Sequence, residues 1–166
     1  GVGAAIADMG ADMRGQRNGR HPLAAHLGAR FVAEHIARLG DLKQRRLVEL
    51  TYDRTWEPAI RDHLTRHRYD FTIGSVHDRV ESPYSPRRVA AWVGGRSLAE
   101  IVAPSFDEVA AAARSGLFDA IGHIDVVKRY LWPHVLPEAL AAAPELYDPI
   151  LRALIESGTA LEVNTS

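Results

Sequence analysis

Residues 47–77, LVELTYDRTWEPAIRDHLTRHRYDFTIGSVH, carry the pattern that decides the fold. They begin with a mostly apolar run that predicts a strand over Leu47–Thr51. Apolar residues then recur at helical spacing, which predicts a helix over residues 55–67 that starts at Thr55. A second strand is predicted over Tyr69–Val76. A strand, a helix and a second strand in this order form the unit that connects parallel strands.

The remainder of the chain repeats this alternation after a loop that reads SPYSPRR. A third strand is predicted over Ala120–Ile124 and a fourth over Ala160–Asn164, while Gly116 and Gly158 are expected to end the helices before them. The predicted class is therefore α/β with a parallel sheet, in which functional residues gather at the carboxyl ends of the strands. The helices are predicted over residues 87–93, 97–115, 137–143 and 145–157.

The composition is that of an ordinary globular protein, with 46% hydrophobic residues, 25% charged residues and a net charge of −1. Such a balance offers no basic surface for nucleic acid, and no apolar run reaches the roughly 20 residues that cross a bilayer. We therefore expect a cytoplasmic protein with neither a nucleic-acid nor a membrane partner. Because the chain has no cysteine, its eight histidines and its carboxylates are the strong ligands left for a transition metal.

Three such residues stand in or directly after predicted strands. Glu49 lies within LVELTY, His77 follows FTIGSV, and His123 lies in AIGHID. A carboxylate and two imidazoles that converge at one sheet edge suit zinc, manganese or iron. Each residue alone is more often a surface carboxylate or a hydrogen-bonded structural histidine, so the hypothesis depends on the three occurring together.

The sequence KRY, residues 128–130, follows His123 closely. An ammonium and a guanidinium beside a metal ion would hold the charge of a phosphate monoester. The alternative interpretation is a solvated basic face on a helix or loop, and the residues alone favour it. His63 and His67 have the i, i+4 spacing of metal ligands, but three arginines surround them, so we expect surface residues.

The segments FTIGSVH, FDAIGHIDVVKRY and LEVNTS, in this order and at these intervals, resemble the polymerase and histidinol phosphatase (PHP) superfamily, and within it the histidinol-phosphatase branch. The resemblance covers about residues 47–166. It implies an incomplete, distorted (βα)7 barrel of the TIM-like type. It also implies two or three divalent metal ions in the complete protein, and hydrolysis of L-histidinol phosphate to L-histidinol in histidine biosynthesis.

The resemblance implies a role for each candidate residue. Glu49 would bridge two metal ions, with His77 and His123 as further ligands. Asp125 would lie behind these ligands and orient His123 or a metal-bound water. The implied phosphate-binding residues are Arg129 and Lys128, and Asn164 would line the mouth of the barrel without an assigned role.

Several motifs of the family have no counterpart in this sequence: an early HxH strand, a further histidine after the second strand, and a late DxH element. We expect the chain to be an excerpt of a longer protein. Residues 1–46, with a predicted helix at Pro22–Leu39, match poorly and form either a diverged segment or a stretch translated in a wrong frame. Residues 47–166 are expected to form the partial PHP barrel domain. With only three ligands, the 166-residue chain alone should have little or no phosphatase activity.

Two other functions stay open at this point. A related PHP phosphoesterase could act on nucleotides or nucleic-acid ends, and a substrate panel would distinguish it from a histidinol-phosphatase. Alternatively, the chain could be a non-catalytic remnant that keeps part of the barrel, in which case its metal content would be near zero. The sequence leaves the native metal and the oligomeric state open.

Overall fold

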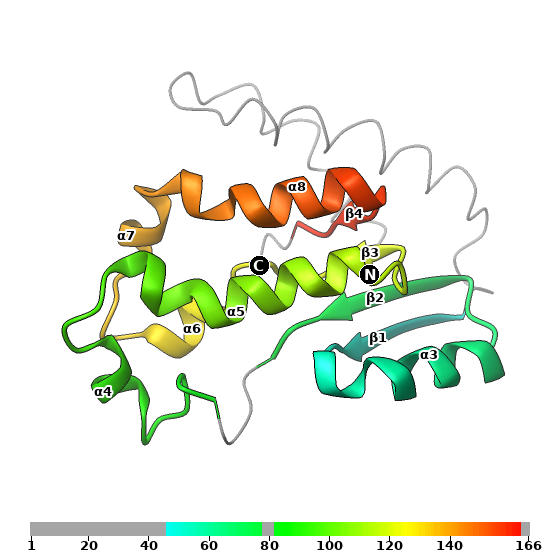
Figure 1. Ribbon diagram of the computed structural model, residues 1–166, viewed down its shortest axis with the longest axis horizontal. Helices are drawn as coiled ribbons and strands as arrows, with labels where there is room; N and C mark the ends of the chain where they lie inside the picture. Colours follow the sequence, from blue (N-terminus) through cyan, green and yellow to red (C-terminus); the bar gives the residue numbers. More distant parts are fainter. Residues whose placement is uncertain (1–45, 78–81, 164–166) are drawn as a thin grey trace.

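The computed structural model describes residues 46–77 and 82–163 (Figure 1). The poorly matched N-terminal segment, including the predicted helix at Pro22–Leu39, lies outside these ranges. No helix of the two described ranges is long and apolar enough to cross a membrane.

Four strands form one parallel sheet, and their order in the sheet is their order in the chain. Glu49 of the first strand is paired with Ile73 of the second, and Ile73 is paired in turn with Ala120 of the third. All four carboxyl ends therefore lie at the same edge of the sheet, which confirms the predicted α/β class. The strands are β1 Leu47–Thr51, β2 Phe71–Ser75, β3 Ala120–Ile121 and β4 Ala160–Leu161.

Helices fill the connections between the strands, and the two longest that follow β2 lie side by side (Figure 1). Ile101, Phe106 and Val109 of one of them are buried, as are Ile150 and Leu154 of the other, so apolar side chains seal the space between helices and sheet. The helical elements are η2 Arg54–Trp56, α3 Glu57–Arg66, α4 Val89–Val93, α5 Leu98–Arg114, α6 Val127–Leu131, α7 Pro137–Ala141, η3 Pro144–Tyr147 and α8 Asp148–Ser157.

Helix α5 has clear sequence signals at both ends. Its N-cap is Ser97, whose side chain accepts a hydrogen bond from the backbone N–H of Glu100, and the Glu100 carboxylate accepts one from the Ser97 backbone. Gly116 follows the helix with φ +65°, as predicted, and Gly158 plays the same role after α8 with φ +70°. Local sequence therefore fixes the length of the helix that supports β2 and β3.

Several predicted boundaries were wrong. The helix expected to start at Thr55 is preceded by the 3-10 turn η2, because the side chain of Asp53 accepts a hydrogen bond from the Thr55 N–H at 2.7 Å and so caps the turn. The third strand ends at Ile121 instead of Ile124, because the chain leaves the sheet after Gly122 and turns, with the Val126 N–H bonded to the His123 carbonyl. The fourth strand, expected to reach Asn164, is assigned only to Leu161.

The short helix α6 contains the KRY sequence. Val127 and Leu131, one turn apart, are both fully buried at 0% exposure, and they anchor the helix to the core. Lys128 is half-buried and Arg129 is exposed. The basic residues therefore stand on a helix whose opposite face is fixed by packing.

Candidate metal centre

The structure brings the three predicted ligands together. Glu49 lies in β1, His77 lies just beyond β2, and His123 lies just beyond β3. One ligand atom from each residue lies within 4.8 Å of the other two. The parallel sheet causes this convergence, because its neighbouring strands end at one edge.

The carboxylate of Glu49 lies between the two imidazoles. Its Oε1 atom is 3.6 Å from Nε2 of His77 and 3.4 Å from Nε2 of His123. The two rings lie nearly edge to face, with centroids 4.8 Å apart and an interplanar angle of 62°. The side chain of His123 is 21% exposed and that of Glu49 52%, so the cluster is open to solvent on one side.

A serine orients this carboxylate. Ser75, the last residue of β2, has no exposed surface, and its hydroxyl donates a hydrogen bond to Oε1 of Glu49 at 2.5 Å. This hydrogen bond, followed by the charges of His123 and His77, holds the pKa of Glu49 below its ordinary value despite its partial burial. Glu49 is therefore ionised at neutral pH, as a metal ligand must be.

The donor set fits a divalent transition metal. Two imidazole nitrogens and a carboxylate oxygen are the ligands that zinc, manganese and iron share. The Nδ1 atom of His123 is buried and has no hydrogen-bond partner within the described ranges. A ligating histidine usually donates its second ring N–H to an acceptor. The described part of the chain supplies no such acceptor for Nδ1 of His123.

The other predicted site residues, Asp125, Lys128 and Arg129, lie in α6 or just before it. Asp125 forms an ion pair with Lys128, and among the described residues no hydrogen bond joins it to His123. Arg129 is exposed and makes no ion pair with another described residue. The roles predicted for these three residues therefore stay predictions.

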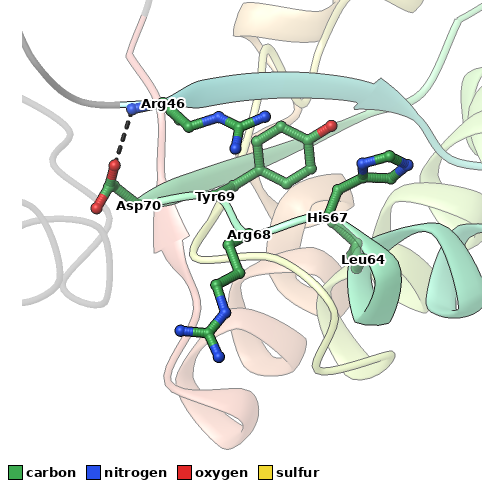
Figure 2. A pocket seen from close by; sticks show the side chains of 6 residues that line it. All are labelled: Arg46, Leu64, His67, Arg68, Tyr69 and Asp70. Atoms are coloured by element: carbon green, nitrogen blue, oxygen red, sulfur yellow. Dashed lines mark hydrogen bonds between the residues drawn. The ribbon is translucent and has the colours of Figure 1, made fainter.

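A cavity of 440 Å³ lies at the opposite end of the strands, next to the residues that precede β1 and β2 (Figure 2). Figure 2 shows the Arg68 side chain directed away from Arg46 and Tyr69, so the two guanidinium groups beside the cavity do not converge on one point. His63 is bonded to the Tyr69 hydroxyl at 3.0 Å. The cavity is lined by Arg46, Leu64, His67, Arg68, Tyr69 and Asp70.

Sequence reasoning missed two polar residues that lie beside the cluster of Glu49, His77 and His123. Ser75 is not among the candidates that the sequence gives, whereas the structure shows that its hydroxyl holds Glu49. Glu162, directly after β4, accepts a hydrogen bond from the His123 backbone N–H at 3.4 Å. The rule that favours strand ends would have found Glu162 if the fourth strand had been predicted to stop at Leu161. Asn164, which sequence reasoning selected instead, lies outside the described residues.

Comparison with known proteins gives one informative relative by sequence. No protein-family model matches the chain. Over 127 residues, the chain is 31% identical to a protein of Deinococcus radiodurans named "Probable histidinol-phosphatase". The match covers 76% of this chain and 46% of that protein, so the chain spans about half the length of the curated relative it matches.

A solved structure is similar to this chain in fold. The chain superimposes with a TM-score of 0.55 on histidinol phosphate phosphatase from Lactococcus lactis, at 21% sequence identity. The superposition covers 81% of this chain and 52% of that enzyme, whose crystal structure contains zinc, L-histidinol and phosphate. Since β1 and β4 are the two edges of the described sheet, the fold is an incomplete version of that enzyme's fold. The chain is thus similar in sequence to a probable histidinol-phosphatase, and similar in fold to part of a solved histidinol phosphate phosphatase, over about half the length of each.

Proposed function

We propose that this chain is part of a metal-dependent phosphomonoesterase that hydrolyses L-histidinol phosphate to L-histidinol and phosphate. The observation that carries the proposal is the convergence of Glu49, His77 and His123 within 4.8 Å at the carboxyl edge of the sheet. The similarity to a probable histidinol-phosphatase supports the substrate. The protein would act in the cytoplasm, within histidine biosynthesis.

The three ligands would hold the metal in the following way. Ser75 fixes the carboxylate of Glu49 and keeps it ionised, and each imidazole presents Nε2 toward that carboxylate. A divalent cation bound there supplies Lewis acidity toward a phosphoryl oxygen and makes the attacking water more acidic. The solvent-open side of the cluster leaves room for the phosphate group.

Arg129 is the residue that we assign to the substrate phosphate. Its guanidinium is exposed and is not engaged by any described carboxylate, so it can form two parallel hydrogen bonds with phosphate oxygens. Lys128 would contribute less, because it must first leave its ion pair with Asp125. Asp125 would accordingly act through Lys128, by setting the position of the ammonium group.

The proposal also divides the chain. Residues 47–166 would form the partial barrel domain, and residues 1–46 a separate N-terminal segment. With the three ligands at hand, the chain alone should turn over its substrate weakly or not at all.

The test compares metal binding and turnover in the purified chain. Loaded with Zn²⁺ or Mn²⁺, the chain is expected to bind about one equivalent of metal, and Glu49→Gln and His123→Ala should remove it. Any phosphate release should require the metal and should be faster with L-histidinol phosphate than with nucleoside monophosphates. His134→Ala, which changes an exposed histidine of the α6–α7 connection, is the control and should behave like the wild type.

Two results would replace the proposal with one of its alternatives. Faster turnover of nucleotides or of phosphorylated nucleic-acid ends would make the chain part of a different PHP phosphoesterase. Metal content near zero at saturating Zn²⁺ and Mn²⁺ would make it a non-catalytic remnant of the fold.

A further inference from the structure

Glu162 is a second carboxylate beside the cluster of Glu49, His77 and His123. It follows β4 directly and is half-buried. Its Oε2 atom accepts the backbone N–H of His123 at 3.4 Å, and its own backbone N–H is bonded to the carbonyl of Ile121 at 2.9 Å. Two contacts therefore connect the end of β4 to the segment that carries His123.

Glu162 does not belong to the ligand group itself. Among the described residues, the atoms that gather within 4.8 Å come from Glu49, His77 and His123 alone. The Glu162 carboxylate is instead directed at the main chain of residues 122–123. Its place is thus next to a ligand's backbone, where it can affect that ligand without binding the metal.

Gly122 makes this approach possible. A Cβ atom at that position would lie 2.8 Å from Oγ of Ser75 and 3.0 Å from Oε2 of Glu162. The contact with Ser75 is too short for a real Cβ, and Ser75 is fully buried and cannot move away freely. The contact with Glu162 would be tight enough to push its carboxylate back by a few tenths of an ångström. The absent side chain therefore lets two polar groups meet around one point: the hydroxyl that holds Glu49 and the carboxylate that holds the backbone of His123.

We propose that Glu162 is a positioning residue for the metal centre, which fixes the backbone of His123 through a hydrogen bond that Gly122 leaves room for. The inference rests on the proposed metal site and goes beyond it, since it assigns the residue that sets the direction of one ligand. The His123 ring faces Glu49 through Nε2 but lacks a partner at Nδ1 in the described part of the chain, so the position of its main chain is a further constraint on where the ring points. A carboxylate that accepts a backbone N–H forms a charge-assisted hydrogen bond, which favours one position over others.

The first experiment uses the chain without metal and measures amide hydrogen exchange at His123. Glu162→Leu removes the acceptor and should accelerate exchange of the His123 amide at least tenfold, whereas Glu162→Gln keeps an acceptor oxygen and should stay within about threefold of the wild type. The matched control is Glu108→Leu, because Glu108 is also half-buried and accepts a backbone N–H, that of Arg54, away from the cluster. Glu108→Leu should expose the Arg54 amide and leave the His123 amide protected.

The second experiment titrates the same variants with Co²⁺ and follows its visible absorption bands, which report the geometry of the ligands. Glu162→Leu should weaken Co²⁺ binding by about 10- to 100-fold and change the band pattern, as for other residues that orient a ligand. Glu162→Gln should restore both, and Glu108→Leu should match the wild type.

Each result decides one of the two proposals. Wild-type protection of His123 in Glu162→Leu, or unchanged Co²⁺ binding by that variant, would overturn the positioning role. Equal losses in Glu162→Gln and Glu162→Leu would overturn it too, since they would show that the charge and not the hydrogen bond matters. If the wild-type chain binds no Co²⁺ while Glu162→Leu still loses protection of His123, the metal centre fails and the hydrogen bond between Glu162 and His123 stands.

Discussion

Ser75 and Glu49 are hydrogen-bonded across two neighbouring strands, with Oγ and Oε1 2.5 Å apart. They are diagonal neighbours in the sheet, since Ser75 is paired with Thr51 and Glu49 with Ile73. The donor is completely buried, and the carboxylate is half-exposed between two imidazoles. A rigid hydroxyl in the core thus determines where a solvent-facing carboxylate points.

Replacing this hydroxyl should weaken metal binding. Ser75→Ala removes the donor, so the pKa of Glu49 should rise toward its ordinary value and its carboxylate should become mobile. We expect Zn²⁺ affinity to fall by about tenfold or more in calorimetric titrations. Ser105→Ala, which removes another buried hydroxyl from α5, is the control. Equal affinities of Ser75→Ala and the wild type would contradict the prediction.

Arg129 should matter for phosphate but not for stability. Arg129→Ala is expected to weaken the binding of inorganic phosphate to the Zn²⁺-loaded chain by about tenfold or more, the loss of one charge-assisted interaction of ~1.4 kcal/mol or more. Lys128→Ala should have a smaller effect, because Lys128 is engaged by Asp125. Arg152→Ala on α8 is the matched control. A larger loss in Lys128→Ala than in Arg129→Ala would reverse the assignment of the two residues.

The connection between β1 and α3 should make stability depend on pH. The Tyr52 hydroxyl donates a hydrogen bond to Glu57 at 2.7 Å, and this bond, followed by Arg61, lowers the pKa of Glu57 from 4.5. A lowered pKa in the folded state stabilises the protein above pH 4.5, and the contribution is lost as the pH falls through the lowered pKa.

Tyr52→Phe tests this dependence, because it keeps the ring against Phe118 and removes only the hydroxyl. The free energy of unfolding of the variant should be lower than that of the wild type near pH 7. The difference should shrink as the pH falls below 4.5. Urea denaturation at a series of pH values measures it, and two parallel stability curves would be inconsistent with the prediction.

The N-cap of α5 should contribute to the stability of the whole sheet, because this helix packs on β2 and β3. Ser97→Ala removes the acceptor for the Glu100 N–H and should lower the free energy of unfolding by about 1 kcal/mol. Glu100→Gln preserves the reciprocal hydrogen bonds and should cost less. Urea denaturation should show a lower midpoint with an unchanged slope. A larger loss in Glu100→Gln would mean that the charge, and not the cap, stabilises the helix.

Periodicity and turn chemistry predicted four parallel strands and most helices, because these depend on local patterns and on the direction of parallel connections. The same reasoning predicted that Glu49, His77 and His123 would meet, since residues at the carboxyl ends of neighbouring parallel strands share an edge. The helix stops at Gly116 and Gly158 were also confirmed, because both adopt positive φ.

The errors arose where tertiary contacts decide. The end of the third strand before Gly122 was not predicted, and at Gly122 the chain lies close to Ser75 and Glu162, which are far from it in the sequence. The fourth strand was also predicted too long, so Glu162 was placed inside it and not at its end. Likewise, the ion pair between Lys128 and Asp125 follows from the helical turn that joins them, which the sequence left open between helix and loop.

The ligands Glu49, His77 and His123 come from three successive strands, so an ion held by all of them would link those strands as a cross-link does. Since the unfolded chain does not hold the three groups together, occupancy of the site and resistance to unfolding would be two measures of one equilibrium. At a free metal concentration 100 times the dissociation constant, the folded state would gain about 2.7 kcal/mol. A chelator would then lower the melting temperature of the sheet, and it would have no such effect on Glu49→Gln.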